Sequence, residues 1–216
     1  MAKQQLRKAE TQKALLNASS RAFRSEGYSG VGVDAIAKEA GATSGAFYAH
    51  LGSKDGAFHA ALEQGLDEVI TTIPDYRERF GDKWVEAFAR YYLGTAHRQD
   101  RACGCAMTAL SPDVARAKPE TRKLYDDKMQ EIASLVAEGL KEGTPSERRN
   151  RAWVFLSLLI GGLTTARAMS DEALAETVTA AALPAALQAA GVCWRPITQA
   201  INRPCQAPET EDIAGA

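Results

Sequence analysis

The chain has 216 residues, of which 45% are hydrophobic and 25% are charged, and its formal net charge is −1. This composition is typical of globular proteins, so it excludes a disordered or fibrous chain and a uniformly basic nucleic-acid coat. The charge is unequally distributed, because residues 1–55 hold eight Lys/Arg against five Asp/Glu and the remainder holds eighteen against twenty-two. A mildly positive N-terminal segment is compatible with contact to a polyanion.

The apolar runs are too short for a membrane span. Residues 1–20 lack the apolar stretch of a signal peptide. The longest apolar run, residues 154–163, covers about half of a membrane span. We therefore expect a cytoplasmic protein with no membrane partner, whose cysteines are reduced thiols. The four cysteines are Cys103, Cys105, Cys193 and Cys205.

Helical spacing of apolar residues dominates the chain, and turn residues divide it into about nine segments, so the sequence predicts an all-α fold. The first predicted helix covers about residues 6–26 and ends at Gly27. Short helices over 33–40 and about 44–50 follow, and then a longer one from about 54 to 73 that Pro74 ends. Further helices are predicted over 82–99, 104–117, 120–142, 146–169 and 171–190, and a flexible tail over 195–216.

The most informative segment is residues 33–51, where a glycine turn joins two short predicted helices. In the second of them Phe47 and Leu51 face the core, whereas Ser44 and Tyr48 face the opposite way. One face of that helix packs against the core, and the opposite face presents small or polar side chains, as a helix that enters a major groove requires. The alternative is a three-helix subdomain with a solvated face.

A set of aromatic, glycine and small polar residues spreads over residues 11–62. Its members are Phe23, Gly27-Tyr28, Val33-Asp34, Ile36-Ala37, Ala40-Gly41, Ser44-Gly45, Phe47-Tyr48, His50, Ser53-Lys54 and Phe58. In these positions residues 11–62 resemble the N-terminal DNA-binding domain of TetR-family transcriptional regulators. Gly32 stands where the family often has a Ser or Thr N-cap, and Leu51 stands where an aromatic residue is common. Both replacements are compatible with the same local structure.

The resemblance implies a helix-turn-helix DNA-binding domain over residues 1–55 and a ligand-binding and dimerisation domain over residues 56–194. It implies a homodimer that represses transcription from a palindromic DNA operator until a small-molecule inducer moves the fourth helix. It places the recognition helix at about residues 44–50. The DNA contacts that it implies come from Thr43, Ser44, Gly45, Tyr48, His50 and Lys54.

The last two long helices are expected to pair with those of a second subunit in a four-helix bundle. Their broad apolar faces and the Gly161-Gly162 pair are compatible with close helix packing. The alternative is ordinary core within one chain. The candidate interface residues are Trp153, Leu156, Ile160, Leu163, Val178 and Leu187.

Aromatic and methionine residues at helical spacing are candidates for the inducer pocket, although such a stripe is more often core. His97, Arg98 and Arg167 are the candidate polar groups. The candidate apolar residues are Trp84, Phe88, Tyr92, Tyr125 and Met129.

Cys105 is the candidate sensor thiol. It follows Arg98 and Arg101 near a predicted helix start, and both features lower the pKa of a thiol. The Gly104-Cys105 pair also resembles a TetR subgroup that includes sensors of electrophiles or oxidants. The alternative is a buried cysteine that packs as a small hydrophobe.

No cofactor, metal or enzymatic activity is expected. Cys103 and Cys105 lack a second ligand pair for zinc, and the sequence contains no phosphate-binding or nucleophile-elbow motif. Two alternatives to a regulator remain: a helical binding module without DNA recognition, and a thiol-dependent enzyme that uses Cys105.

Overall fold

The computed structural model describes residues 2–192, with side chains from residue 4 onward. All regular structure in this range is helical, with eleven α-helices and one 3-10 turn, so the predicted all-α fold is confirmed. None of these helices is long and apolar enough to cross a membrane. The predicted tail over 195–216, Cys193 and Cys205 lie outside the described residues.

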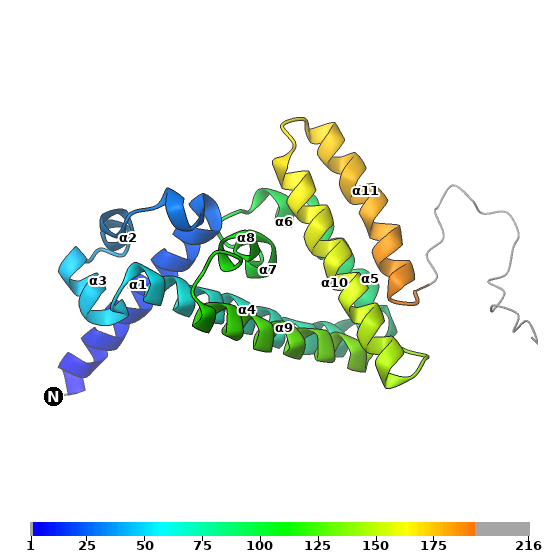
Figure 1. Cartoon of the computed structure of the whole chain (residues 1–216), viewed down its shortest axis with the longest axis horizontal. Coiled ribbons are helices and arrows are strands. Elements are labelled where there is room, and N and C mark those ends of the chain that lie inside the picture. Colours follow the sequence, from blue (N-terminus) through cyan, green and yellow to red (C-terminus); the bar gives the residue numbers. More distant parts are fainter. Residues whose placement is uncertain (1, 193–216) are drawn as a thin grey trace, which may run out of the picture.

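The N-terminal unit is built from α1 (Ala2–Gly30), α2 (Val33–Glu39) and α3 (Ser44–Leu51). Helix α1 begins earlier than predicted and kinks at Gly27, whose φ of 74° is non-helical. The glycine therefore interrupts the helix where the sequence predicts its end. Figure 1 shows α1–α3 packed together at one end of the molecule, with α4 (Lys54–Phe80) running from them toward the other end.

Three aromatic rings hold this unit onto the first turns of α4. The ring of Phe58 in α4 packs edge-to-face on those of Phe23 and Tyr28, at centroid distances of 5.4 and 5.3 Å. Edge-to-face aromatic pairs add to the stability that their buried area already provides. Fully buried aliphatic and aromatic side chains from all four helices complete the core: Leu15, Ala18, Phe23, Ile36, Phe47 and Leu62.

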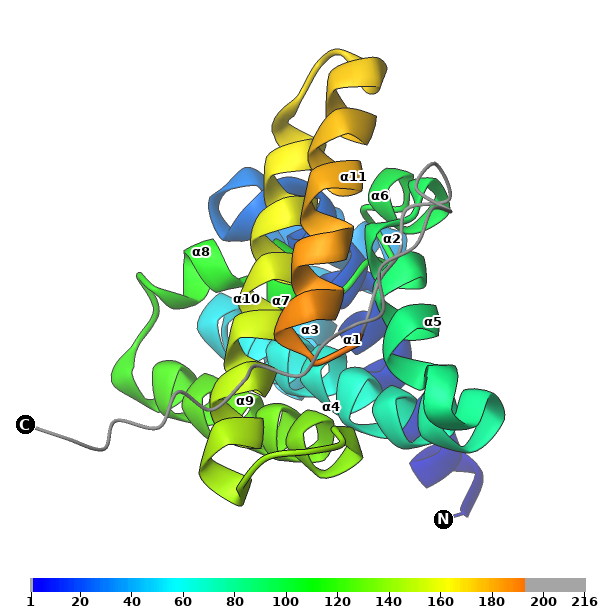
Figure 2. The same cartoon turned by 90° about the vertical axis from the view of Figure 1, so that its right-hand side faces the viewer.

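The C-terminal part is a helical layer that begins with α4. Helices α4 and α9 (Pro119–Gly139) run side by side along one edge. Helices α10 (Pro145–Ala168) and α11 (Glu172–Ala189) form an antiparallel pair at the end opposite α3 (Figures 1 and 2). The elements between α4 and α9 are η1 (Gly81–Lys83), α5 (Trp84–Leu93), α6 (Thr95–Gln99), α7 (Ala106–Ala109) and α8 (Ser111–Val114).

Several predicted helix boundaries are wrong. The helix predicted over 82–99 is broken at Gly94, which is extended at φ −70° and ψ 157°. The helix predicted over 104–117 is the two short helices α7 and α8. Conversely, Pro74 lies inside α4 and does not end it, whereas the helix predicted over 171–190 is α11, with Pro184 inside it. A proline removes one backbone donor, and the packing of a long helix outweighs that loss.

Candidate DNA-binding surface, cavity and dimer face

Gly41 makes the sharp turn between α2 and α3. Its φ is 66°, in the left-handed region where a glycine has no Cβ clash. The N–H of Ala42 donates to the carbonyl of Ala37 at 2.8 Å, and the N–H of Gly41 donates to the carbonyl of Lys38 at 3.1 Å. These two bonds form a Schellman motif, which ends α2 and directs the chain into α3.

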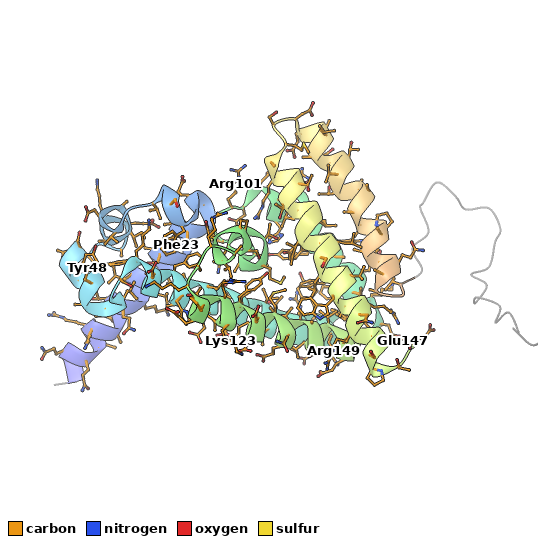
Figure 3. The ribbon with its side chains drawn as sticks, in the orientation of Figure 1. Phe23, Tyr48, Arg101, Lys123, Glu147 and Arg149 are labelled. Atoms are coloured by element: carbon orange, nitrogen blue, oxygen red, sulfur yellow. The ribbon has the colours of Figure 1, made fainter. Side chains whose placement is uncertain are left out.

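Helix α3 is anchored at its start and on one face. The Thr43 hydroxyl accepts a 3.1 Å hydrogen bond from the N–H of Ala46, so Thr43 is the N-cap. Phe47 is fully buried, whereas Tyr48 is 54% exposed. Figure 3 shows Tyr48 at the outer side of α3, at the end of the molecule remote from α10 and α11. The helix therefore presents an aromatic hydroxyl outward from a fixed backbone.

The other predicted DNA contacts lie on or beside α3, and two of them have partners within the chain. The Ser44 hydroxyl donates to Asp34 of α2. The ammonium of Lys54 lies 4.6 Å from the centroid of the Tyr28 ring, a cation–π contact that fixes the start of α4. Gly45 is exposed, and Nδ1 of His50 is buried without a hydrogen-bond partner among the described residues.

The N-terminal turns of α1 carry further basic side chains, which the sequence reasoning did not name among the DNA contacts. Arg7, Lys8 and Lys13 are exposed there, and none of them forms an ion pair within the described part of the chain. Figure 1 places these turns at the same end of the molecule as α3. The excess of Lys and Arg before residue 14 could have indicated these side chains, but the spacing of apolar residues, on which the helix prediction rests, carries no information about charge.

A chain of polar contacts joins the N-terminal unit to the start of α9. The Tyr28 hydroxyl donates to the carboxylate of Asp55, which also pairs with the ammonium of Lys118 at 2.9 Å. The bond to Asp55 raises the pKa of Tyr28 to about 12. The Tyr28 hydroxyl and then Lys118 lower the pKa of Asp55. At neutral pH the carboxylate is therefore charged and holds α1, α4 and α9 together.

A cavity of about 380 Å³ opens between α4, α5 and the segment that follows α6. Its size falls in the range of small-molecule sites, roughly 300–1,000 Å³. Of the predicted pocket residues, Phe88, Tyr92, Cys105 and His97 line it. Tyr91, which shares the aromatic helical stripe of Phe88 and Tyr92, also lines it. The lining residues that the sequence reasoning missed are Gly65, Glu68, Val69, Thr72, Asp75, Tyr76, Arg79 and Cys103.

Five predicted pocket residues lie elsewhere, two arginines and three large apolar or aromatic residues. Arg98 is buried and pairs with Glu172 of α11, and Arg167 donates to backbone carbonyls within residues 97–100. Trp84 is buried at the N-terminal end of α5, where its indole N–H donates to the carbonyl of Gly139 at 3.2 Å. Met129 is buried on α9, and the hydroxyl of Tyr125 bonds that of Ser111. Helical spacing identified the three apolar or aromatic residues as inward-facing, which is correct, but spacing does not indicate which interior surface borders the cavity.

The environment of Cys105 is the reverse of the one predicted. Burial raises the pKa of the Cys105 thiol, and hydrogen bonds from the Tyr92 hydroxyl and the backbone oppose this only in part. The helix that follows, α7, has four residues, and the guanidinium of Arg101 donates to the carbonyl of Arg167. Arg101 lies beside the upper end of α10 in Figure 3. The N–H groups of Met107 and Thr108 and the charge of Arg24 act to lower the pKa of Cys105, but burial outweighs them.

His97 is held as a neutral ring. Its Nδ1 lies 2.7 Å from the carbonyl oxygen of Tyr92, and its Nε2 accepts a 3.1 Å bond from the N–H of Cys105. An acceptor Nε2 places the ring proton on Nδ1. Burial, as the main cause, lowers the pKa of His97. The described residues contain no cluster of three or more metal-binding side chains.

Helices α10 and α11 bury part of the face predicted for dimer contact. Leu156, Leu163 and Leu187 are 0% exposed, so they belong to the core of this chain and the prediction is wrong for them. Ile160 and Val178 are half-buried, and Trp153 is 36% exposed.

A different stripe faces outward on the two helices. Its members recur at intervals of three and four residues, the spacing of a helix-bundle seam. Val154 and Leu174 are each 50% exposed and are the large apolar members. The exposed residues of the stripe are Val154, Ser157, Gly161 and Thr164 on α10, and Leu174, Thr177, Ala181 and Ala185 on α11.

The two adjacent glycines of α10 lie on different faces of the helix, Gly162 toward α11 and Gly161 toward the outside. A Cβ on Gly162 would lie 2.8 Å from Cβ of Ala182, so this glycine allows α10 and α11 to approach within the chain. A Cβ on Gly161 would meet no atom within 4 Å. Gly161 therefore leaves the outer face of α10 flat.

Comparisons with known proteins agree with this geometry. Residues 15–61 match the family model of bacterial regulatory proteins, tetR family. The HTH-type transcriptional regulator LmrA of Bacillus subtilis (strain 168) is 24% identical over 159 residues, which is 71% of this chain and 85% of LmrA.

Solved structures share the fold over most of the chain. The reduced form of Escherichia coli NemR is similar with a TM-score of 0.66 and 19% identity, over 80% of this chain and 94% of NemR. AibR, solved in complex with isovaleryl coenzyme A and operator DNA, is similar with a TM-score of 0.60 and 16% identity. That likeness covers 81% of this chain and 96% of AibR. The N-terminal helix-turn-helix unit thus matches the tetR family of bacterial regulatory proteins over residues 15–61, and the chain as a whole has the fold of solved TetR-family transcriptional regulators.

Proposed function

We propose that this protein is a repressor that binds a palindromic DNA operator as a homodimer and releases it when a small molecule occupies the cavity beside α4. The observation that carries the proposal is α3, a capped helix with one buried face and an exposed tyrosine, in a unit that matches a family of DNA-binding regulators. As a regulator that acts on DNA, it works in the cytoplasm. We infer no enzymatic role.

The DNA-binding domain comprises residues 1–55, in which α3 enters the major groove. Tyr48 and Gly45 are exposed and provide a hydroxyl and room for close approach to the groove. The hydroxyls of Thr43 and Ser44 and the ring of His50 lie on the same helix or its cap. Lys54 contacts a phosphate as a point charge at the start of α4. Arg7, Lys8 and Lys13 add phosphate contacts from α1.

The dimer forms through the outward stripe of α10 and α11. Small side chains and an exposed glycine let two such helix pairs approach closely, and Val154 and Leu174 provide apolar area. A two-fold dimer of this kind presents two copies of α3 to successive major grooves, and its operator is therefore palindromic.

The inducer is a small molecule with an aromatic or flat apolar part and at least one hydrogen-bonding group. Phe88, Tyr91 and Tyr76 provide ring faces in the cavity, and the Tyr76 and Phe88 rings lie edge-to-face at 5.4 Å. Glu68, Asp75 and Thr72 provide polar groups on α4. The relative AibR, solved with both a small-molecule ligand and operator DNA, is the precedent for one protein holding both.

Modification of Cys105 is a second candidate trigger. Both Cys105 and the exposed Cys103 border the cavity. The structure of NemR to which this chain is similar is that of its reduced form. The raised pKa of Cys105 disfavours the thiolate at neutral pH, so a bound ligand is the favoured trigger.

The first experiment is selection of duplexes from random sequence with the full-length protein, followed by titration of the selected duplex against competitor DNA. A palindromic consensus that binds with strong salt dependence is the expected result. Failure to enrich any sequence would favour a helical binding module without DNA recognition.

The same titration with N-ethylmaleimide separates the two triggers. Loss of binding that Cys105→Ser prevents supports thiol modification at that residue. Binding that survives the reagent supports a non-covalent inducer.

A further inference from the structure

The segment Asp100–Cys105, here the 100–105 loop, lies between α6 and α7 and touches three parts of the molecule. Cys103 and Cys105 border the cavity. Arg24 of α1 and Arg167 of α10 both bond the backbone of this loop or of the residues just before it. The loop therefore has contacts with the cavity, the DNA-binding unit and the helix pair.

Arg24 attaches the loop to α1. Its side chain is only 4% exposed and pairs with Glu68 at 2.8 Å. Its Nη1 donates to the carbonyl oxygens of Gly104 at 3.1 Å and Cys103 at 3.4 Å. Bonds from a charged, buried donor are roughly twice as strong as neutral ones, so the loop follows the position of α1.

The side chain of Arg24 is packed so closely that no space remains beside its guanidinium. A Cβ on Gly65 of α4 would lie 2.6 Å from Nη2 of Arg24 and 2.6 Å from Cβ of Ala106. Helices α1, α4 and α7 therefore cross at one glycine, which also borders the cavity. Glu68 borders the cavity too, so a molecule bound there lies against one of the two partners of the ion pair.

Arg167 attaches the other end of the loop to α10. Its guanidinium donates to the carbonyl oxygens of His97 at 2.7 Å, Asp100 at 3.1 Å and Arg98 at 3.2 Å. A Cβ on Gly104 would collide with this guanidinium, so the loop and Arg167 are also in close contact.

From this arrangement we infer that Arg24 and Arg167 are positioning residues, and that the 100–105 loop between them couples the cavity to the DNA-binding unit and to α10. The inference rests on the proposed function. A loop has no hydrogen-bond ladder of its own, so the two guanidinium groups determine where its carbonyl groups lie. A displacement of the loop by a molecule in the cavity is transmitted to α1 through Arg24. Release of the loop from α10 loosens α1 in the same way.

The test uses Arg167→Gln in the full-length chain, because Arg167 lies in α10 and donates no hydrogen bond to α1. Hydrogen exchange of the peptide over residues 20–30 is measured, together with affinity for the duplex that the wild-type protein selects. Coupling through the loop predicts about tenfold faster exchange in that peptide and about tenfold weaker DNA binding.

Arg151→Gln is the matched control. Arg151 lies on the same helix and also donates to several carbonyl groups, including that of Ala189 at 3.2 Å and that of Glu142 at 3.0 Å, far from the loop. It should leave both readouts within about twofold of wild type. Sedimentation at the assay concentration confirms that each variant keeps the oligomeric state of the wild type.

Equal effects of the two variants would overturn the inference, since they would show general loosening of α10. Exchange that rises only in the loop and α10 would overturn it as well. If Arg167→Gln does not fold, Arg167→Lys replaces it, because lysine keeps the positive charge but lacks the planar set of donors of a guanidinium. Arg167→Lys is expected to give a smaller increase in the exchange rate of the same peptide. If the wild type selects no duplex, the proposed function fails, whereas the exchange measurement still decides whether the loop couples α10 to α1.

Discussion

The backbone N–H of Tyr28, at the end of α1, donates a 2.8 Å hydrogen bond to the carboxylate of Asp113 in α8. Asp113 also pairs with Arg116 at 3.0 Å and is itself mostly buried, with 16% of its side chain exposed. The kink at Gly27 frees the N–H of Tyr28 from the helical ladder, and Asp113 accepts it. The end of α1 thus depends on a side chain from the C-terminal part of the chain.

Replacement of Asp113 by alanine should therefore lower stability. It leaves a partly buried backbone donor without a partner, which costs about 1–3 kcal/mol. In a protein of this size that corresponds to a fall in Tm of roughly 2–4 °C per kcal/mol. Thermal unfolding followed by circular dichroism measures it. Asp113→Asn keeps an acceptor oxygen and should fall between alanine and wild type, and equal losses for both variants would contradict this explanation.

Tyr48→Ala should weaken DNA binding without weakening the fold. Tyr48 is 54% exposed, so its removal exposes no core, whereas removing one side chain that reaches the groove lowers affinity about tenfold. Titration of the selected duplex and a thermal melt measure the two effects. Phe80→Ala is the matched control, because Phe80 is 41% exposed at the C-terminal end of α4 and does not line the cavity. DNA affinity that is equal for the two variants would remove Tyr48 from the DNA-binding surface.

The basic turns of α1 should contribute affinity that depends on salt and not on sequence. Arg7→Gln and Lys8→Gln each remove one positive charge, so the slope of log K against log salt should fall by about 0.9 for each phosphate that is no longer neutralised. Lys123→Gln, which removes an exposed charge from α9 (Figure 3), should leave the slope unchanged. A slope that all three variants share with wild type would place the N-terminal turns away from the DNA.

The helix-turn-helix was predictable because its determinants are local. Gly41, Thr43 and Phe47 fix the turn, the cap and the buried face within seven residues, and each has the conformation or contact that its chemistry predicts. Such features do not depend on where the rest of the chain packs.

The cavity and the dimer face were less predictable, because both depend on contacts between distant segments. The spacing of Leu156 and Leu163 shows that they are buried, but not whether the covering helix is α11 of the same chain or a second subunit. The pKa of Cys105 depends on its burial beside Tyr92, which no nearby residue in the sequence reveals. Glu68, which follows the DNA-binding unit by only a few turns of α4, borders the cavity because of how α5 lies across that helix.

Stability should fall in mildly acidic solution, and His97 should account for part of the fall. Burial lowers the pKa of His97 from its ordinary value of 6.5, so the folded state keeps the ring neutral while the unfolded chain takes up a proton. The contribution of His97 is therefore present above about pH 6.5 and is lost as pH falls below it. His97→Gln should show a smaller loss of unfolding free energy between about pH 7.5 and about pH 5.5 than wild type. Equal losses in urea titrations at the two pH values would show that His97 does not carry the effect.

Gly161→Arg should separate the subunits while leaving each one folded. A side chain at this position meets no atom within 4 Å in the chain, so the substitution is sterically free in a monomer. In the proposed dimer it places a long charged side chain in the middle of the outward stripe, where burial without a partner is unfavourable. Sedimentation should show a lower mass, and DNA affinity should fall because two α3 helices no longer bind together. Glu131→Arg introduces the same exposed side chain on α9 and should remain dimeric. An unchanged mass for Gly161→Arg would move the dimer contact to another face.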